Sequence, residues 1–114
     1  MSASPDLSQL QAMVDGWITT VGNGYFGPLT NGLVLAEEAG EVCRILARLY
    51  GDQRPKPGDP ATAEALADEL ADVIWVCAAL ANQTGTDLTA AMARNLAKKT
   101  CRDRDRFGDR TTNE

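Results

Sequence analysis

Four carboxylates lie where the sequence predicts the buried faces of two helices. They form two pairs with the same spacing of three residues, Glu38 with Glu41 and Glu69 with Asp72. When each residue is given about 100° of rotation, Glu38 falls within the apolar stripe of one helix, and the second pair flanks the stripe of another. Carboxylates beside a core are costly unless their charge is compensated. A divalent cation is the compensator that two such pairs suggest.

Residues three apart on a helix project from the same side, so the two pairs could hold one ion between neighbouring helices. The chain has no histidine, and Cys43, Cys77 and Cys101 are too far apart for a cysteine metal motif or a disulfide framework. Ligands that are all oxygen favour a hard ion, so we expect Mg²⁺, with Mn²⁺ as a substitute. The alternative is that these acids are solvated surface residues, which is how we interpret Glu64 and Asp68 near a helix start.

Basic residues follow late in the chain and could bind a polyphosphate. Asn95, Lys99 and Arg102 continue one face of the last expected helix, and Lys98 is adjacent. A row of cations beside a metal site is what phosphate groups require. The alternative is a solvated basic helix end, which the helix dipole favours.

A nucleobase could stack on Trp17, Tyr25 or Phe26, although core packing is an alternative role for Trp17. Asn31 lies about two turns before Glu38 on the same face. Its side chain could bind a ligand or cap the helix.

The elements that must position these residues are all helical. Ala and Leu dominate a chain of 114 residues that is 44% hydrophobic and 5% aromatic, which favours helices packing on helices. The hydrophobic spacing and capping residues predict four helices, with glycine- and proline-rich loops over Gly22–Pro28 and Asp52–Pro60. They are expected from Asp6 to about Val21, from a cap at Thr30 or Asn31 to Gly51, from Ala63 to about Thr84, and after a cap at Thr86 or Asp87.

Composition also limits the partners and the location. The net charge of −5 argues against a nucleic acid polymer as partner. No stretch reaches the roughly 18 apolar residues of a membrane span, so we expect no membrane partner and a cytoplasmic protein. We expect one domain over residues 1–107 and a flexible tail over 108–114.

The two acid pairs also carry a family resemblance. Residues 37–41 read EExxE, and Glu69 to Asp72 reads ExxD, with Glu69 28 residues after Glu41. Together with their surroundings, from roughly Leu7 to Phe107, they resemble the MazG-type nucleotide pyrophosphohydrolases of the all-α NTP pyrophosphatase superfamily.

The resemblance implies an all-α, MazG-like bundle of four to five helices that is completed by forming a homodimer or homotetramer. It also implies Mg²⁺-dependent hydrolysis of a nucleoside triphosphate to the monophosphate and pyrophosphate, by attack of a metal-activated water on the α-phosphate. Nucleotide-pool house-cleaning is the expected role. The family's metal ligands match Glu38, Glu41, Glu69 and Asp72, and its cations on the last helix match Lys98 or Lys99 and Arg102. Glu37 or Glu41 would orient the water.

Three alternatives remain at this point. A catalytically silent regulatory module that binds metal or nucleotide would keep the same acids. A carboxylate-bridged di-iron or di-manganese bundle uses ExxH pairs, and the absence of histidine counts against it. A purely structural dimerisation protein gives no reason for acids in apolar stripes.

Overall fold

The computed structural model describes residues 4–59 and 61–107 of the chain. In this part the chain forms helices without strands, which confirms the predicted all-α fold. The elements in chain order are α1 (Leu7–Thr20), α2 (Pro28–Tyr50), α3 (Ala63–Thr84) and α4 (Leu88–Phe107). The flexible tail predicted for residues 108–114 lies outside the described residues.

Helices α1 and α3 begin and end as their sequences predict. The Asp6 carboxylate accepts a hydrogen bond from the Gln9 backbone N–H at 2.8 Å, and the Gln9 side chain accepts one from the Asp6 N–H at 2.9 Å. Thr62 caps α3 by accepting from the Ala65 N–H at 3.1 Å. Gly85 ends α3 with φ 68°, in the left-handed region that favours glycine.

Helix α2 begins earlier than predicted. Its N-cap is Gly27, and Pro28 is the first helical residue, so the expectation of a cap at Thr30 or Asn31 is wrong. Proline suits this position because the first helical N–H has no partner within the helix. Asn31 therefore lies inside the helix, where its buried side chain contacts other elements. Of the two caps considered for α4, Asp87 is the one observed, because its carboxylate accepts from the backbone N–H groups of the next turn.

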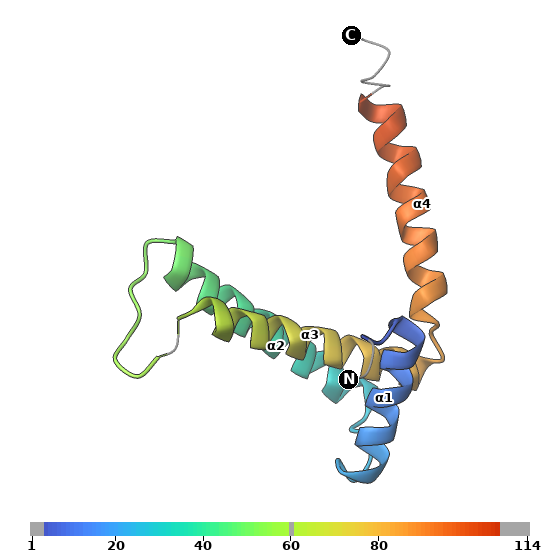
Figure 1. The fold of residues 1–114 in the computed structure, drawn as a ribbon, viewed down its shortest axis with the longest axis horizontal. Helices are drawn as coiled ribbons and strands as arrows, with labels where there is room; N and C mark the ends of the chain where they lie inside the picture. Colours follow the sequence, from blue (N-terminus) through green and yellow to red (C-terminus); the bar gives the residue numbers. More distant parts are fainter. Residues whose placement is uncertain (1–3, 60, 108–114) are drawn as a thin grey trace.

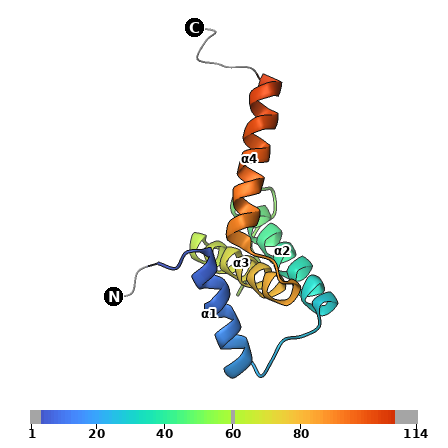
Figure 2. The same ribbon diagram turned by 90° about the vertical axis from the view of Figure 1, so that its right-hand side faces the viewer.

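The helices α2 and α3 lie side by side and form a long antiparallel arm, with the loop of residues 51–59 at its far end (Figure 1). Helix α1 packs across α3 at the other end of the arm. Helix α4 contacts α1 near its start and then projects away from the arm, as Figures 1 and 2 both show.

The core is small, and its main cluster lies where α1 crosses α3. Val14 and Ile18 of α1 pack against Ala78 and Ala79 of α3. The two alanines let the helix backbones approach closely. Ile45 of α2 is fully buried further along the arm.

The chain leaves a large apolar surface uncovered. Its radius of gyration is 18.3 Å, whereas a compact chain of this size has about 13 Å. Its accessible surface is 8577 Å², against roughly 6,000 Å² for a folded monomer of this mass. Leu33 of α2, Ile74 of α3 and Leu96 of α4 are each more than half exposed. Among the described residues, no helix is both long and apolar enough to cross a membrane.

Two glycine substitutions should have opposite effects on stability. Gly85→Ala should lower the free energy of unfolding by roughly 1–2 kcal/mol, because alanine is strained in the left-handed conformation. Gly16→Ala, within α1 and with open space at its Cβ position, should raise it by about 0.5–1 kcal/mol. Urea denaturation of both variants measures the two effects. Equal shifts of the same sign would contradict the assigned end of α3.

Candidate active site

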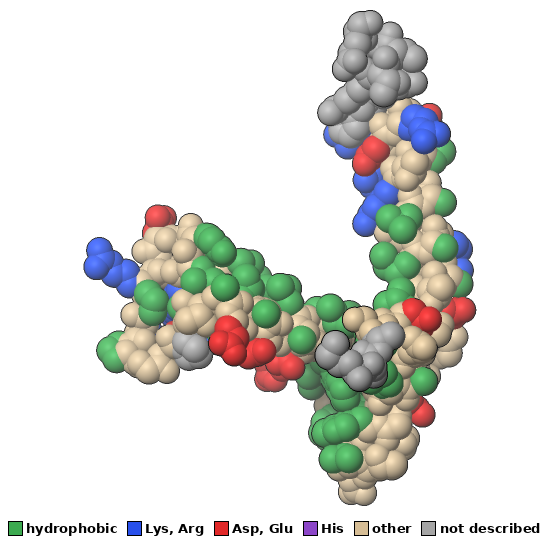
Figure 3. All heavy atoms as spheres, viewed as in Figure 1, with side chains coloured by type: hydrophobic (Ala, Val, Ile, Leu, Met, Phe, Trp, Pro, Cys, Tyr) green, Lys and Arg blue, Asp and Glu red, His purple; other side chains and the backbone are tan. Residues whose placement is uncertain are grey.

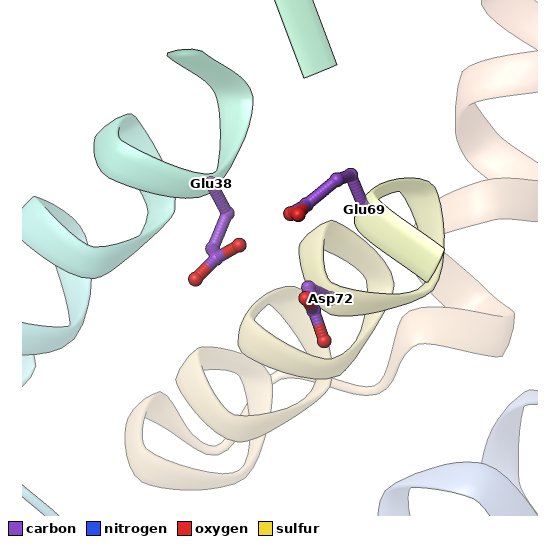
Figure 4. A group of neighbouring side chains, drawn as sticks. All are labelled: Glu38, Glu69 and Asp72. Carbon is purple, nitrogen blue, oxygen red and sulfur yellow. The ribbon is translucent and has the colours of Figure 1, made fainter. Parts of the chain in front are cut away.

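Three of the predicted acids meet between α2 and α3. Glu38 of α2 and Glu69 and Asp72 of α3 each offer a carboxylate oxygen, and these atoms lie within 4.8 Å of one another. Figure 4 shows the side chains converging from the two helices. The antiparallel pairing produces this cluster because it sets Glu38 opposite the i, i+3 pair of α3.

The cluster is electrostatically unfavourable without a cation. Partial burial raises the pKa of the Glu38 carboxyl, and the neighbouring Glu69, Asp72 and Glu37 raise it further. Within the described part of the chain, no lysine or arginine forms an ion pair with the three clustered acids. Three hard oxygen donors with no compensating charge fit a divalent ion such as Mg²⁺ or Mn²⁺.

The other two predicted acids lie beside the cluster without joining it. The Glu41 carboxylate accepts a hydrogen bond from Arg44 Nε at 3.0 Å. Arg44 also contacts Asp59, whose other oxygen lies 3.0 Å from Arg48 Nε. These ion pairs attach the connecting loop to α2, about two to three turns beyond Glu38. Glu37 is exposed and follows the exposed Ala36 on the outer side of α2.

Within one chain, the basic residues predicted to bind phosphate do not lie beside the acid cluster. Asn95, Lys98, Lys99 and Arg102 are all exposed on α4. In the described residues, this part of α4 does not pack along α2 or α3. Figure 3 shows acidic side chains gathered on the arm and basic ones along the projecting α4.

A pocket lined by aromatic side chains opens about one helical turn from the acids. Val34 precedes Glu38 by four residues on α2, and Trp75 follows Asp72 by three on α3. Both line the pocket, whose volume is about 170 Å³. Trp17 forms an edge-to-face contact with Trp75, with ring centroids 5.3 Å apart. Trp17 is 49% exposed, so it forms a pocket wall rather than part of the buried core.

The loop before α2 supplies the rest of the pocket wall. Tyr25 and Phe26, both considered for base stacking, line it together with Asn31. The Tyr25 hydroxyl donates to Asp15 at 2.6 Å and accepts from Asn82 at 3.2 Å. Burial and the hydrogen bond to Asp15 raise the pKa of Tyr25. The loop is thereby held against both α1 and α3.

Sequence reasoning missed two residues of this region. Trp75 lies three residues after Asp72 and so faces the same side of α3, a spacing that could have revealed it. Gln83 hydrogen-bonds Asn31 at 2.8 Å. The two residues are 52 positions apart in the chain, so no local signal predicts that bond.

Comparison with known proteins identifies the family. Residues 26–107 match the model of the MazG nucleotide pyrophosphohydrolase domain. The chain belongs to the MazG family. It is therefore a nucleotide pyrophosphohydrolase, and the predicted resemblance is confirmed.

Individual MazG relatives agree over most of the chain. The uncharacterised protein YpjD of Bacillus subtilis is 34% identical over 101 residues, which cover 89% of each chain. A crystal structure of YpjD matches with a TM-score of 0.74 and 31% identity, covering 85% of this chain and 97% of that one. The crystal structure of the Bacillus-conserved MazG protein, a nucleotide pyrophosphohydrolase, matches with a TM-score of 0.70 and 28% identity over 96% of both chains.

Glu38→Gln should raise the melting temperature of this MazG protein when no metal is present. The substitution removes one of three crowded negative charges and keeps the side-chain size. Glu64→Gln is the control, because Glu64 is exposed in the first turn of α3, where a negative charge is favourable. Thermal unfolding in EDTA compares the two variants with the wild type. A lower melting temperature for Glu38→Gln would show that the acids do not repel one another.

Proposed function

We propose that this protein hydrolyses nucleoside triphosphates to the monophosphate and pyrophosphate, with Mg²⁺ held by Glu38, Glu69 and Asp72. The observation that carries the proposal is the convergence of these three carboxylates without a compensating cation in the described residues. House-cleaning of the nucleotide pool in the cytoplasm is the role that this reaction would serve.

The chemistry divides between the ion and the side chains of the chain. When bound, Mg²⁺ would spread the charge of the triphosphate and lower the pKa of a coordinated water. Glu38, Glu69 and Asp72 would hold the ion through their carboxylate oxygens. The attacking water forms a bond to the α-phosphorus, the bond to the bridging oxygen breaks, and pyrophosphate leaves.

Glu41 and Glu37 are the candidates to orient the water and accept its proton. Glu41 lies one turn after Glu38 on α2, and its carboxylate accepts a hydrogen bond from Arg44. Release of Glu41 from Arg44 would let it serve as a fourth ligand, and Arg44 would keep its contact with Asp59. Glu37 is the exposed neighbour of Glu38 and needs no such release.

We also propose that the enzyme works as a homodimer or homotetramer. The exposed apolar side chains of Leu33, Ile74 and Leu96 need a cover that one chain does not supply. Since the cations of α4 lie away from the acids of their own chain, Lys98, Lys99 and Arg102 would reach the phosphates bound by a neighbouring subunit. Asn95 shares their face of α4 and could add a hydrogen bond.

Asp72→Asn should lower the rate of Mg²⁺-dependent pyrophosphate release by a factor of roughly 100 or more. The substitution removes one of the negative charges that would hold the ion at the reacting phosphate. Asp68→Asn is the matched control, one turn earlier on α3 and outside the cluster. Phosphorus NMR with a panel of NTPs and dNTPs, with and without Mg²⁺, identifies the products. Orthophosphate as the product would contradict the proposed bond cleavage. Binding without turnover by the wild type would favour a regulatory module instead.

A further inference from the structure

The aromatic pocket has the size of a single six-membered ring. Its volume is about 170 Å³, and an apolar protein cavity of about 150 Å³ accommodates benzene. Trp17, Trp75 and Phe26 provide flat apolar surfaces around it. A pyrimidine ring therefore fits within the pocket, whereas the second ring of a purine would have to extend toward its open side.

One polar side chain lies deep in the pocket wall. Asn31 is 92% buried, with 8% of its surface exposed. It precedes Glu38 by seven residues on α2, which corresponds to about 10 Å along the helix axis. The pocket therefore extends from the side of the acids toward Asn31.

The hydrogen bonds around Asn31 fix which way its amide points. The Phe26 carbonyl oxygen accepts from Gln83 Nε2 at 2.5 Å and from Asn31 Nδ2 at 3.5 Å. Because a backbone carbonyl can only accept, both side-chain amides must present their NH₂ groups to it. Gln83 Oε1 is then the acceptor for Asn31 Nδ2, at 2.8 Å.

This network uses the hydrogen-bond donors of Asn31 and leaves its acceptor available. Both N–H groups of Nδ2 are engaged, and Asn31 Oδ1 accepts no hydrogen bond from the described residues. If the Asn31 amide were flipped, its oxygen would face the Phe26 carbonyl oxygen and Gln83 Oε1, and neither of these can donate a hydrogen bond. Asn31 Oδ1 is therefore an acceptor that a ligand with an N–H group can engage in place of water.

We propose that the pocket recognises the amino group of cytosine, with Asn31 Oδ1 as the acceptor that selects it. In a pyrimidine, C4 lies directly across the ring from N1, which carries the sugar. With the sugar and phosphates toward the acids, the C4 substituent points toward Asn31. Cytosine places an N–H donor there, whereas uracil and thymine place a carbonyl oxygen against Oδ1. This assignment rests on the proposed function of the acid cluster.

The test is the binding of dCMP and dUMP to the full-length protein in Mg²⁺ buffer. The protein has two tryptophans, Trp17 and Trp75, and both line the pocket, so their fluorescence reports occupancy. We expect dCMP to bind about tenfold or more tightly than dUMP, which corresponds to the cost of one unsatisfied buried polar group. Asn31→Ala should remove this preference. Val34→Ala, which shortens an apolar side chain in the pocket wall, should weaken the binding of both nucleotides and keep the preference for dCMP.

Equal or tighter binding of dUMP, tighter binding of dAMP, or no binding of any of these nucleotides would overturn the inference. If Asn31→Ala does not fold, the preference of the wild-type protein between dCMP and dUMP decides the question. These outcomes are independent of pyrophosphate release, which phosphorus NMR follows separately. A failure of base selection can therefore be distinguished from a failure of the proposed hydrolysis.

Discussion

The register between α2 and α3 is the constraint on which the rest of the structure depends. Three carboxylates that repel one another are held together because polar contacts fix the two helices on both sides of them. On one side, Asn31 binds Gln83. On the other, Asp59 in the loop that connects the two helices pairs with arginines of α2. A slip of one turn between α2 and α3 would break the Asn31–Gln83 hydrogen bond and separate the acids, so the arm supplies the rigidity that a metal site requires.

The sequence predicted much of this arrangement because the relevant signals are local. Helical periodicity located the acids, and capping chemistry located the ends of α1 and α3. The start of α2 was missed because Pro28 was assigned to the preceding loop, although proline suits a first helical position. The contacts of Asn31 with Gln83 and of Arg44 with Asp59 were missed for a different reason. They join residues far apart in the chain, and no periodicity encodes such pairs.

The direction of α4 was also beyond the sequence. Met92, Leu96 and the cations share one face of α4, which predicts a helix that packs beside the acid site. In one chain, however, α4 projects away from the arm. A helix with exposed apolar residues gains stability only by covering them. The proposed oligomer supplies that cover and accounts for the distance between the cations and the acids. The enzyme's phosphate site and its assembly would then depend on the same helix.

The most direct test of this account is the location of the bound metal. Crystals grown with Mn²⁺ and measured for anomalous scattering should show a peak within bonding distance, about 2.2 Å, of oxygens from Glu38, Glu69 and Asp72. Glu41 turning from Arg44 toward the same peak would identify it as a fourth ligand. A peak elsewhere, or none at these three side chains at saturating Mn²⁺, would contradict the claim that the acid cluster exists to hold a divalent ion.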